Sequence, residues 1–129
     1  MIEILLVEDE ILHARLIRKN LEYLKLECHI VHVTHGYDAI KQMHDFVAQQ
    51  QKFVVLLDLN LPDMHGLRIL QTMCQDDNLQ HIRVIVLSTS DDPAELGEIR
   101  ALGYPYFMVK PPNYRLLMDR IEALWEDSV

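Results

Sequence analysis

Residues 53–66 of the chain read FVVLLDLNLPDMHG, and this stretch decides the fold. Apolar residues run without alternation as far as Asp58, which is typical of a strand buried on both faces of a sheet. Asn60, Pro62 and Gly66 then indicate a polar loop. We therefore expect Asp58 at the carboxyl end of a buried strand. An Asp there either belongs to a ligand-binding edge or only forms a turn or caps a helix, and the stretch by itself leaves both interpretations open.

The same pattern, a buried strand followed by an amphipathic helix, recurs along the chain. The predicted strands cover residues 2–7, 28–33, 53–58, 83–87 and 106–109. Helices are expected to begin near residues 11, 36, 67 and 93, and a last one contains Leu117, Ile121 and Leu124. A β-α unit repeated five times predicts an α/β fold with a doubly wound parallel sheet and right-handed crossovers.

The first predicted helix has a clear apolar stripe. Leu12, Leu16, Ile17, Leu21 and Leu24 recur at helical spacing, with basic side chains between them. We expect these five residues to face the core.

Size and composition favour a single domain over residues 1–129, with no separate output domain. Half of the 129 residues are apolar, and no linker or repeat divides the chain. Glu3 and the acidic residues after it are unlike a signal peptide, and no apolar run is long enough to cross a bilayer. We expect a cytoplasmic protein without a membrane partner. Cys28 and Cys74 are too few for a disulfide framework and are interpreted as reduced and structural.

The formal net charge of −8 restricts the partners. Such a surface repels phosphates, which argues against nucleic acid as a direct partner. Proteins and cations are favoured instead.

Polar residues end several of the predicted strands. Glu8 and Asp9 follow the first strand, Asp58 ends the third, Ser88 follows the fourth and Lys110 follows the fifth. Parallel strands bring their carboxyl ends to one edge, so these side chains are expected to meet there. Clustered carboxylates and room for water suit Mg²⁺. With Lys110 and Ser88 to hold phosphoryl oxygens, Asp58 is positioned to attack phosphorus and form an acyl phosphate.

Four motifs give the chain a close resemblance to the receiver domains of bacterial two-component response regulators. They are VEDE at 7–10, LDLNLPDMHG at 57–66, VLSTS at 86–90 and VKP at 109–111, in family order. The resemblance covers the whole chain and implies a flavodoxin-like (βα)5 domain with strand order 2-1-3-4-5. The motif at 57–66, together with Ser88 to Ser90, is most similar to stand-alone regulators that partner phytochrome-type histidine kinases.

The resemblance implies a role for each matched residue. Asp58 is the phospho-acceptor, with Asp9 as a Mg²⁺ ligand, Glu8 acting through water and the backbone carbonyl of Asn60 as a further ligand. Ser88 and Phe107 form a switch pair, and Lys110 forms a salt bridge at the site and precedes a proline bond that is typically cis. The implied function is a phosphorelay switch. It receives its phosphoryl group from a histidine kinase or a phosphotransfer protein, acts on a downstream protein, and assists only its own phosphorylation and dephosphorylation.

Three positions depart from the family pattern. Glu8 replaces the commoner Asp, Ser88 stands where Thr is frequent, and Pro112 stands where an aromatic residue is often found. None of these changes removes a chemical group that the mechanism needs.

Two alternatives compete with this hypothesis. The first is a Mg²⁺-dependent aspartate-nucleophile phosphohydrolase of the haloacid dehalogenase type. It needs an acid/base Asp two residues after the nucleophile, where this chain has Asn60. The second is a receiver-like interaction module that is never phosphorylated. Loss of Asp58, Lys110 or the acidic pair would favour it, but all are present.

Two further features carry expectations. His29, His32 and His35 follow one another at intervals of three, and residues three apart on a strand face opposite sides, so without a turn they do not converge on a metal. Met118 and Trp125 form a second apolar stripe on the last helix, beyond the residues that its core face needs. We expect this stripe to mediate a homodimer or a kinase contact, strengthened by phosphorylation, through the face made by the fourth helix, fifth strand and last helix. The pattern also allows that Trp125 only folds over the helix terminus.

Overall fold

The computed structural model describes residues 1–127, which form five strands and five helices in strict alternation. In chain order these are β1 (Ile2–Val7), α1 (Ile11–Tyr23), β2 (Cys28–Val33), α2 (Gly36–Ala48), β3 (Val54–Asp58), α3 (Gly66–Gln75), β4 (Arg83–Ser88), α4 (Pro93–Ala101), β5 (Phe107–Val109) and α5 (Tyr114–Asp127). The strands are all parallel and lie in the order β2-β1-β3-β4-β5. The doubly wound α/β prediction and the strand order are therefore confirmed.

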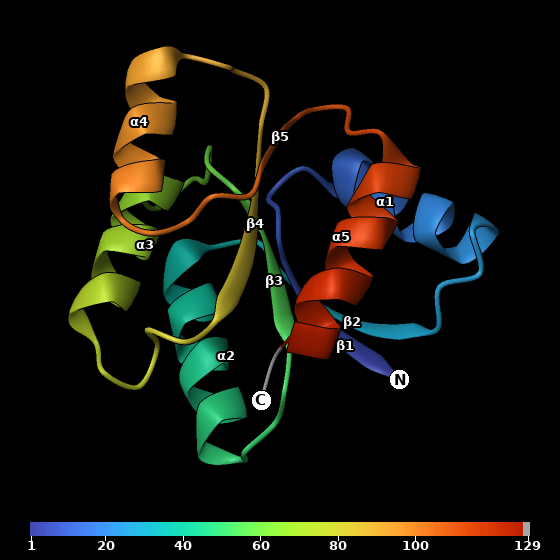
Figure 1. Cartoon of the computed structure of the whole chain (residues 1–129), viewed down its shortest axis with the longest axis horizontal. Helices are drawn as coiled ribbons and strands as arrows, with labels where there is room; N and C mark the ends of the chain where they lie inside the picture. The colour runs from blue at the N-terminus through green and yellow to red at the C-terminus, as the bar shows by residue number, and fades with distance from the viewer. Residues whose placement is uncertain (128–129) are drawn as a thin grey trace.

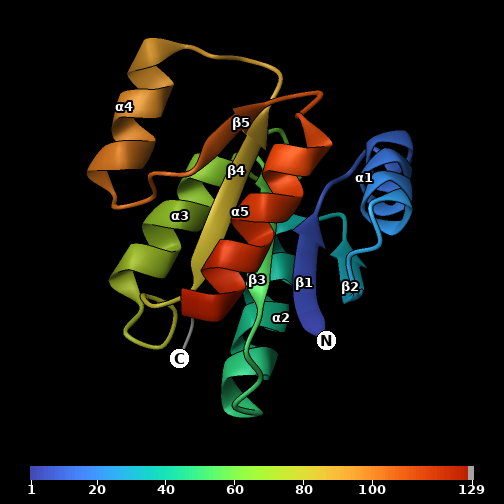
Figure 2. The same cartoon turned by 45° about the vertical axis from the view of Figure 1, so that its right-hand side comes forward.

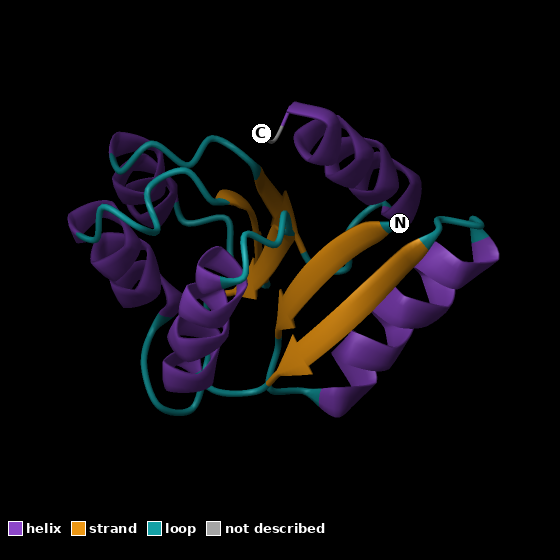
Figure 3. Cartoon of the chain, turned by 90° about the horizontal axis from the view of Figure 1, so that it is seen from below, coloured by secondary structure: helices purple, strands orange, loops and turns teal. Residues whose placement is uncertain are grey.

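Helices cover both faces of the sheet (Figures 1 and 3). Residues of α2, α3 and α4 pack with alternate strand residues into one apolar cluster, which we call the α2–α4 cluster. Residues of α1 and α5 pack with the other strand residues into the α1/α5 cluster. In β3, Val55 and Leu57 belong to the α2–α4 cluster and Val54 and Leu56 to the α1/α5 cluster. This division explains why β3 is apolar without alternation: both of its faces are buried.

The apolar face of α1 is narrower than the sequence predicted. Ala14, Ile17 and Leu21 are buried, whereas Leu12 is 67% exposed and Leu16 is also exposed. A helix that packs on a sheet buries one stripe, and Leu12 and Leu16 lie beside that stripe. The expectation that both leucines face the core is wrong.

The supposed second stripe of α5 is also needed by the core. Met118 is only 9% exposed and belongs to the α1/α5 cluster, and Trp125 is half-buried against the same cluster. Lys52 Nζ lies 4.5 Å from the centroid of the Trp125 ring and covers it further. The argument for a homodimer through Met118 and Trp125 is therefore wrong, because α5 lies against the sheet (Figure 2) and both residues pack into or against the α1/α5 cluster.

The loop after β3 is fixed by two contacts. The Asp63 carboxylate accepts hydrogen bonds from the backbone N–H groups of Gly36 and Tyr37, at 2.7 and 3.0 Å, and so caps the first turn of α2. At Gly66 the chain passes so close to β3 that an added Cβ would lie 2.8 Å from Leu59 Cα, which only glycine tolerates. The residues that follow Asp58 are thereby held in one conformation.

None of the helices between residues 1 and 127 combines the length and apolarity that crossing a bilayer requires.

Candidate functional site

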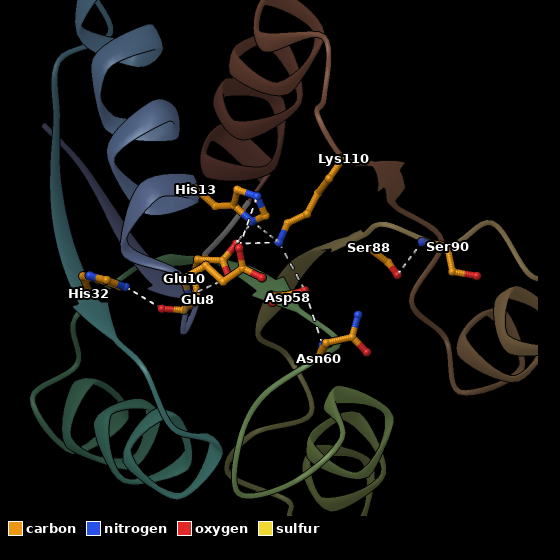
Figure 4. Close-up of polar contacts among 9 residues, drawn as sticks. All are labelled: Glu8, Glu10, His13, His32, Asp58, Asn60, Ser88, Ser90 and Lys110. Carbon is orange, nitrogen blue, oxygen red and sulfur yellow. Dashed lines mark hydrogen bonds and ion pairs between the residues drawn. The ribbon is translucent and has the colours of Figure 1, made fainter.

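Three charged side chains converge at the carboxyl edge of the sheet (Figure 4). Lys110 Nζ donates to Glu8 Oε1 at 2.5 Å and lies 3.4 Å from Asp58 Oδ1. Each of these side chains comes two positions after a residue of the α1/α5 cluster: Glu8 after Leu6, Asp58 after Leu56 and Lys110 after Met108. Side chains two apart on a strand share a face, so the sheet directs all three toward the same side. The predicted convergence of these residues thus follows from strand alternation as well as from the common edge.

The acidic residues of this edge form one compact group. Glu8, Asp9 and Asp58 each offer a carboxylate oxygen, and these oxygens lie within 4.8 Å of one another. Glu8 is 1% exposed and Asp58 is 4% exposed, while Asp9 is partly open to solvent. Burial, followed by the hydrogen bond and the charge of the nearby Glu8 carboxylate, raises the pKa of Asp58 to about 6, against the opposing effects of Lys110 and the Asn60 N–H. The group therefore carries more negative charge than its single lysine neutralises.

A hard divalent cation fits this group. The donors are carboxylate oxygens, and the partly exposed Asp9 leaves one side accessible to water. Glu8, Asp9 and Asp58 would hold the ion, and its charge would relieve the repulsion that raises the Asp58 pKa. Asn60 follows closely along the loop, where its backbone N–H donates to Asp58 Oδ1 at 3.3 Å.

Ser88 lies at the same edge but on the other face of the sheet. Ser88 comes two positions after Val86, which belongs to the α2–α4 cluster. Val86 in turn pairs with Phe107 on β5. Ser88 Oγ accepts a hydrogen bond from the Ser90 N–H at 3.1 Å. Figure 4 shows Ser88 on the side of Asp58 away from Glu8. The structure thus places Ser88 on the same face of the sheet as Phe107 and apart from the Lys110 ion pairs, a separation that strand alternation could have predicted.

Sequence reasoning missed one residue of the site, His13, and gave no separate role to Glu10 of the VEDE motif. His13 lies in the first turn of α1, with Nδ1 3.1 Å from Lys110 Nζ and 3.5 Å from Glu8 Oε1. Its Nε2 lies 3.4 Å from Glu10 Oε2. The available signal was position: α1 begins directly after the acidic motif, so its first turn must lie over the carboxyl edge.

The other histidines do not gather into a site. His29 pairs with Glu3 at 2.9 Å, and His32 Nε2 donates to the backbone carbonyl of Glu8 at 2.6 Å. Between residues 1 and 127, the residues grouped closely enough to hold a metal are the three carboxylates already described. The Lys110–Pro111 peptide bond is cis.

A cleft of about 740 Å³ lies at the opposite edge of the sheet, away from this chemistry. Residues before β3, β4 and β5 line it, including Phe53, Ile82 and Tyr104. None of the acidic group contributes to it.

The fold and the site together define a class of protein: a doubly wound α/β domain whose carboxyl edge carries a buried acidic group and a lysine. The chain belongs to the response regulator receiver domain family, whose model matches residues 4–122. Members of this family function in phosphorylation-dependent signalling.

Solved structures agree with this assignment. A response regulator receiver domain from Rhodospirillum rubrum is 32% identical with a TM-score of 0.77, over 96% of this chain and 91% of that one. The bacteriophytochrome response regulator AtBRR is 31% identical with a TM-score of 0.79, over 96% of this chain and 94% of that one. Among curated relatives, Stress response regulator protein 1 of Candida albicans is 26% identical over 112 residues. That match takes in 87% of this chain but only 38% of the length of the Candida protein.

The buried charge of Asp58 leads to a prediction about stability. At pH above 6 the carboxylate is ionised in both the folded and the unfolded protein, and ionisation costs more in the folded state because the folded pKa is raised. Asp58→Asn removes that cost. Without divalent cations, the variant should gain about 3 kcal/mol in the free energy of unfolding at pH 7.5. The gain should shrink as the pH falls from 6 and vanish below the ordinary pKa of 3.8. Urea unfolding at several pH values measures it.

Asp63→Asn is the matched control for this experiment. Burial acts to raise the pKa of Asp63, but hydrogen bonds from the Tyr37 and Gly36 N–H groups outweigh it and lower the pKa overall. Asp63 therefore stabilises the fold at neutral pH, and that contribution is lost as the pH falls through its lowered pKa. The two Asn variants should shift stability in opposite directions at pH 7.5. Equal shifts of the same sign would contradict the assignment of a charge cost to Asp58.

Proposed function

We propose that this chain is a cytoplasmic phosphorelay switch in which Asp58 accepts a phosphoryl group from a histidine kinase or a phosphotransfer protein. One observation carries the proposal: Asp58 is a buried carboxylate that lies with Glu8 and Asp9 in one acidic group and 3.4 Å from Lys110 Nζ. A carboxylate in this setting has both a cation site and an ammonium group close to the phosphorus it would attack.

Each group has a defined task in the transfer. An Asp58 carboxylate oxygen forms a bond to phosphorus while the bond from phosphorus to the donor breaks, and the donor leaves with the electron pair. Lys110, 3.4 Å from Asp58 Oδ1, is within reach of a phosphoryl oxygen on that carboxylate. Glu8 and Asp9 would hold Mg²⁺, which supplies positive charge against the phosphoryl oxygens when it is bound. The Asn60 N–H keeps the Asp58 carboxylate oriented.

Ser88 and Phe107 connect the phosphoryl group to the surface. Both lie on the α2–α4 side of the sheet, and the partly buried Phe107 packs against the cluster there. If the Ser88 hydroxyl leaves the Ser90 N–H to meet a phosphoryl oxygen, it vacates space beside Phe107. A ring that fills this space changes the surface around α4 and β5, which alters affinity for a downstream protein only through contacts that differ between the two states.

An exposed apolar surface at the start of α1, at the edge of the sheet that carries Asp58, is a candidate contact for the protein that donates the phosphoryl group. Ile11 and Leu12 in the first turn of α1 are exposed, and Leu16 follows one turn later. This stripe suits a helical partner that must bring a phosphohistidine to the carboxyl edge. The similarity to a bacteriophytochrome response regulator supports a phytochrome-type kinase as that partner.

Incubation with Mg²⁺ and acetyl phosphate tests the proposal. Intact mass spectrometry should record the addition of one phosphoryl group, and the adduct should not form when EDTA replaces Mg²⁺. A chain that never gains the group from acetyl phosphate or from phosphorylated kinase is an unphosphorylated interaction module instead. Continuous release of phosphate from many small phosphate esters would favour the phosphohydrolase alternative.

We further propose that phosphorylation strengthens a homodimer through the face formed by α4, β5 and α5. The exposed apolar residues of this face are Val109 and Leu116, not the buried Met118. Leu116 lies one helical turn before Arg120. The guanidinium carbon of Arg120 lies 4.5 Å from the centroid of the ring of Tyr106, the residue just before β5. Sedimentation with beryllofluoride should show a dimer that Leu116→Ser weakens and Leu12→Ser leaves intact. A monomer under every condition would contradict the dimer.

A further inference from the structure

The Lys110 ammonium group has three protons and three acceptors within reach. They are Glu8 Oε1 at 2.5 Å, His13 Nδ1 at 3.1 Å and Asp58 Oδ1 at 3.4 Å. The Lys110 side chain is only 8% exposed, so little water is available to replace a lost acceptor. Figure 4 shows the His13 ring facing the end of the lysine from α1. The position of the ammonium group is thus set by three side chains from three different elements.

The geometry assigns one tautomer to His13. Nδ1 faces the ammonium group, which can only donate, so Nδ1 carries the lone pair and accepts. A ring that accepts at Nδ1 carries its proton on Nε2, which faces Glu10 Oε2 at 3.4 Å. Glu10 thereby fixes the ring orientation from the far side, as a carboxylate does for many functional histidines.

The three acceptors differ in what the proposed function demands of them. Asp58 becomes bonded to phosphorus, and Glu8 belongs to the acidic group that fits a cation. A carboxylate oriented toward a cation and its waters is no longer free to hold the lysine at short range. His13 is neither the nucleophile nor a member of the acidic group, so it is the acceptor that Lys110 can keep throughout.

We propose that His13 is a positioning residue that holds the Lys110 ammonium group beside Asp58 when Glu8 turns to a cation. The inference rests on the proposed function and adds to it a residue that the family motifs quoted above do not contain. His13 touches neither phosphorus nor its donor. Its effect is exerted through Lys110, which loses one of its three acceptors if the ring is removed.

Two substitutions separate positioning from simple packing. His13→Leu fills a similar volume but offers no acceptor. His13→Asn keeps an acceptor, because the Asn amide oxygen occupies about the place of Nδ1 on its shorter side chain. The His13 side chain is 32% exposed, so both variants should fold. Urea unfolding checks that both variants fold: their unfolding transitions should match that of the wild type.

The first measurement is the rate of phosphorylation by acetyl phosphate, with Mg²⁺ affinity measured beside it. His13→Leu should slow the reaction by about tenfold, as expected for loss of a group that orients a functional side chain, and His13→Asn should stay near the wild type. Mg²⁺ affinity should be the same in all three proteins. Equal rates for His13→Leu and the wild type would overturn the inference. So would equal losses in both variants, or a loss of Mg²⁺ affinity parallel to the loss of rate.

The second measurement needs neither metal nor phosphate. In protein labelled with ¹⁵N at histidine, the His13 spectrum should show Nδ1 unprotonated and Nε2 protonated. Its Nδ1 resonance should move in Lys110→Met, which removes the donor. A ring protonated at both nitrogens, or one insensitive to Lys110→Met, would overturn the inference. If the wild type accepts no phosphoryl group at all, the proposed function fails, while this spectrum still decides whether His13 holds Lys110.

Discussion

Asp58→Asn should abolish phosphorylation of the chain by acetyl phosphate and by any kinase. Asp58 is the carboxylate that lies 3.4 Å from Lys110 and within the acidic group that fits Mg²⁺. Asn has nearly the same shape, but its neutral amide is a far weaker nucleophile than a carboxylate. The variant should therefore fold, with the gain in stability predicted above, and show no phosphoryl adduct by intact mass.

Asp63→Asn is the control for that result. Asp63 lies in the same loop, but its carboxylate is occupied in capping α2. This variant should still gain one phosphoryl group, at a position that peptide mass spectrometry assigns to Asp58. If Asp58→Asn is modified as fast as the wild type, the acceptor has been misassigned.

Asp9→Ala should have the second largest effect, because it removes one member of the acidic group and the one most open to solvent. Mg²⁺ affinity should fall by more than about tenfold, and the rate of phosphorylation should fall with it. Titration calorimetry with Mg²⁺ measures the first quantity and intact mass over time measures the second.

Glu10→Ala is the matched control for Asp9. Its carboxylate is adjacent in sequence, yet it faces His13 Nε2 and is not part of the acidic group. Mg²⁺ affinity in Glu10→Ala should stay close to the wild type. A Mg²⁺ titration unchanged by Asp9→Ala, or weakened equally by Glu10→Ala, would show that the site depends on general negative charge and not on the geometry of three oxygens.

The sequence by itself determined the architecture and the edge at which the chemistry gathers. A strand such as Val54–Asp58 is apolar at every position up to its last, and only a sheet covered on both faces buries such a strand completely. Five repeats of strand and helix then require parallel strands, and parallel strands have their carboxyl ends together. Glu8, Asp58 and Lys110 were therefore predictable as neighbours although up to 102 positions separate them.

Only the tertiary structure decided which face of each helix is buried and which side chains of different elements contact one another. Spacing marks Leu12, Leu16 and Met118 as apolar, but which of them is buried depends on the angle at which α1 and α5 lie on the sheet. That angle results from packing among side chains remote in sequence. The structure exposes Leu12 and Leu16 beside the site and buries Met118, the reverse of what the sequence pattern suggested.

The periodic pattern of the sequence could not show the role of His13, for the same reason. Its role depends on a contact of 3.1 Å between the first turn of α1 and a lysine 97 positions away, after β5. A periodic pattern indicates which side of an element is buried, because burial needs only a hydrophobic face. A hydrogen bond between two elements needs their relative placement to within a fraction of an ångström, and that placement is set by the packed core of the whole chain.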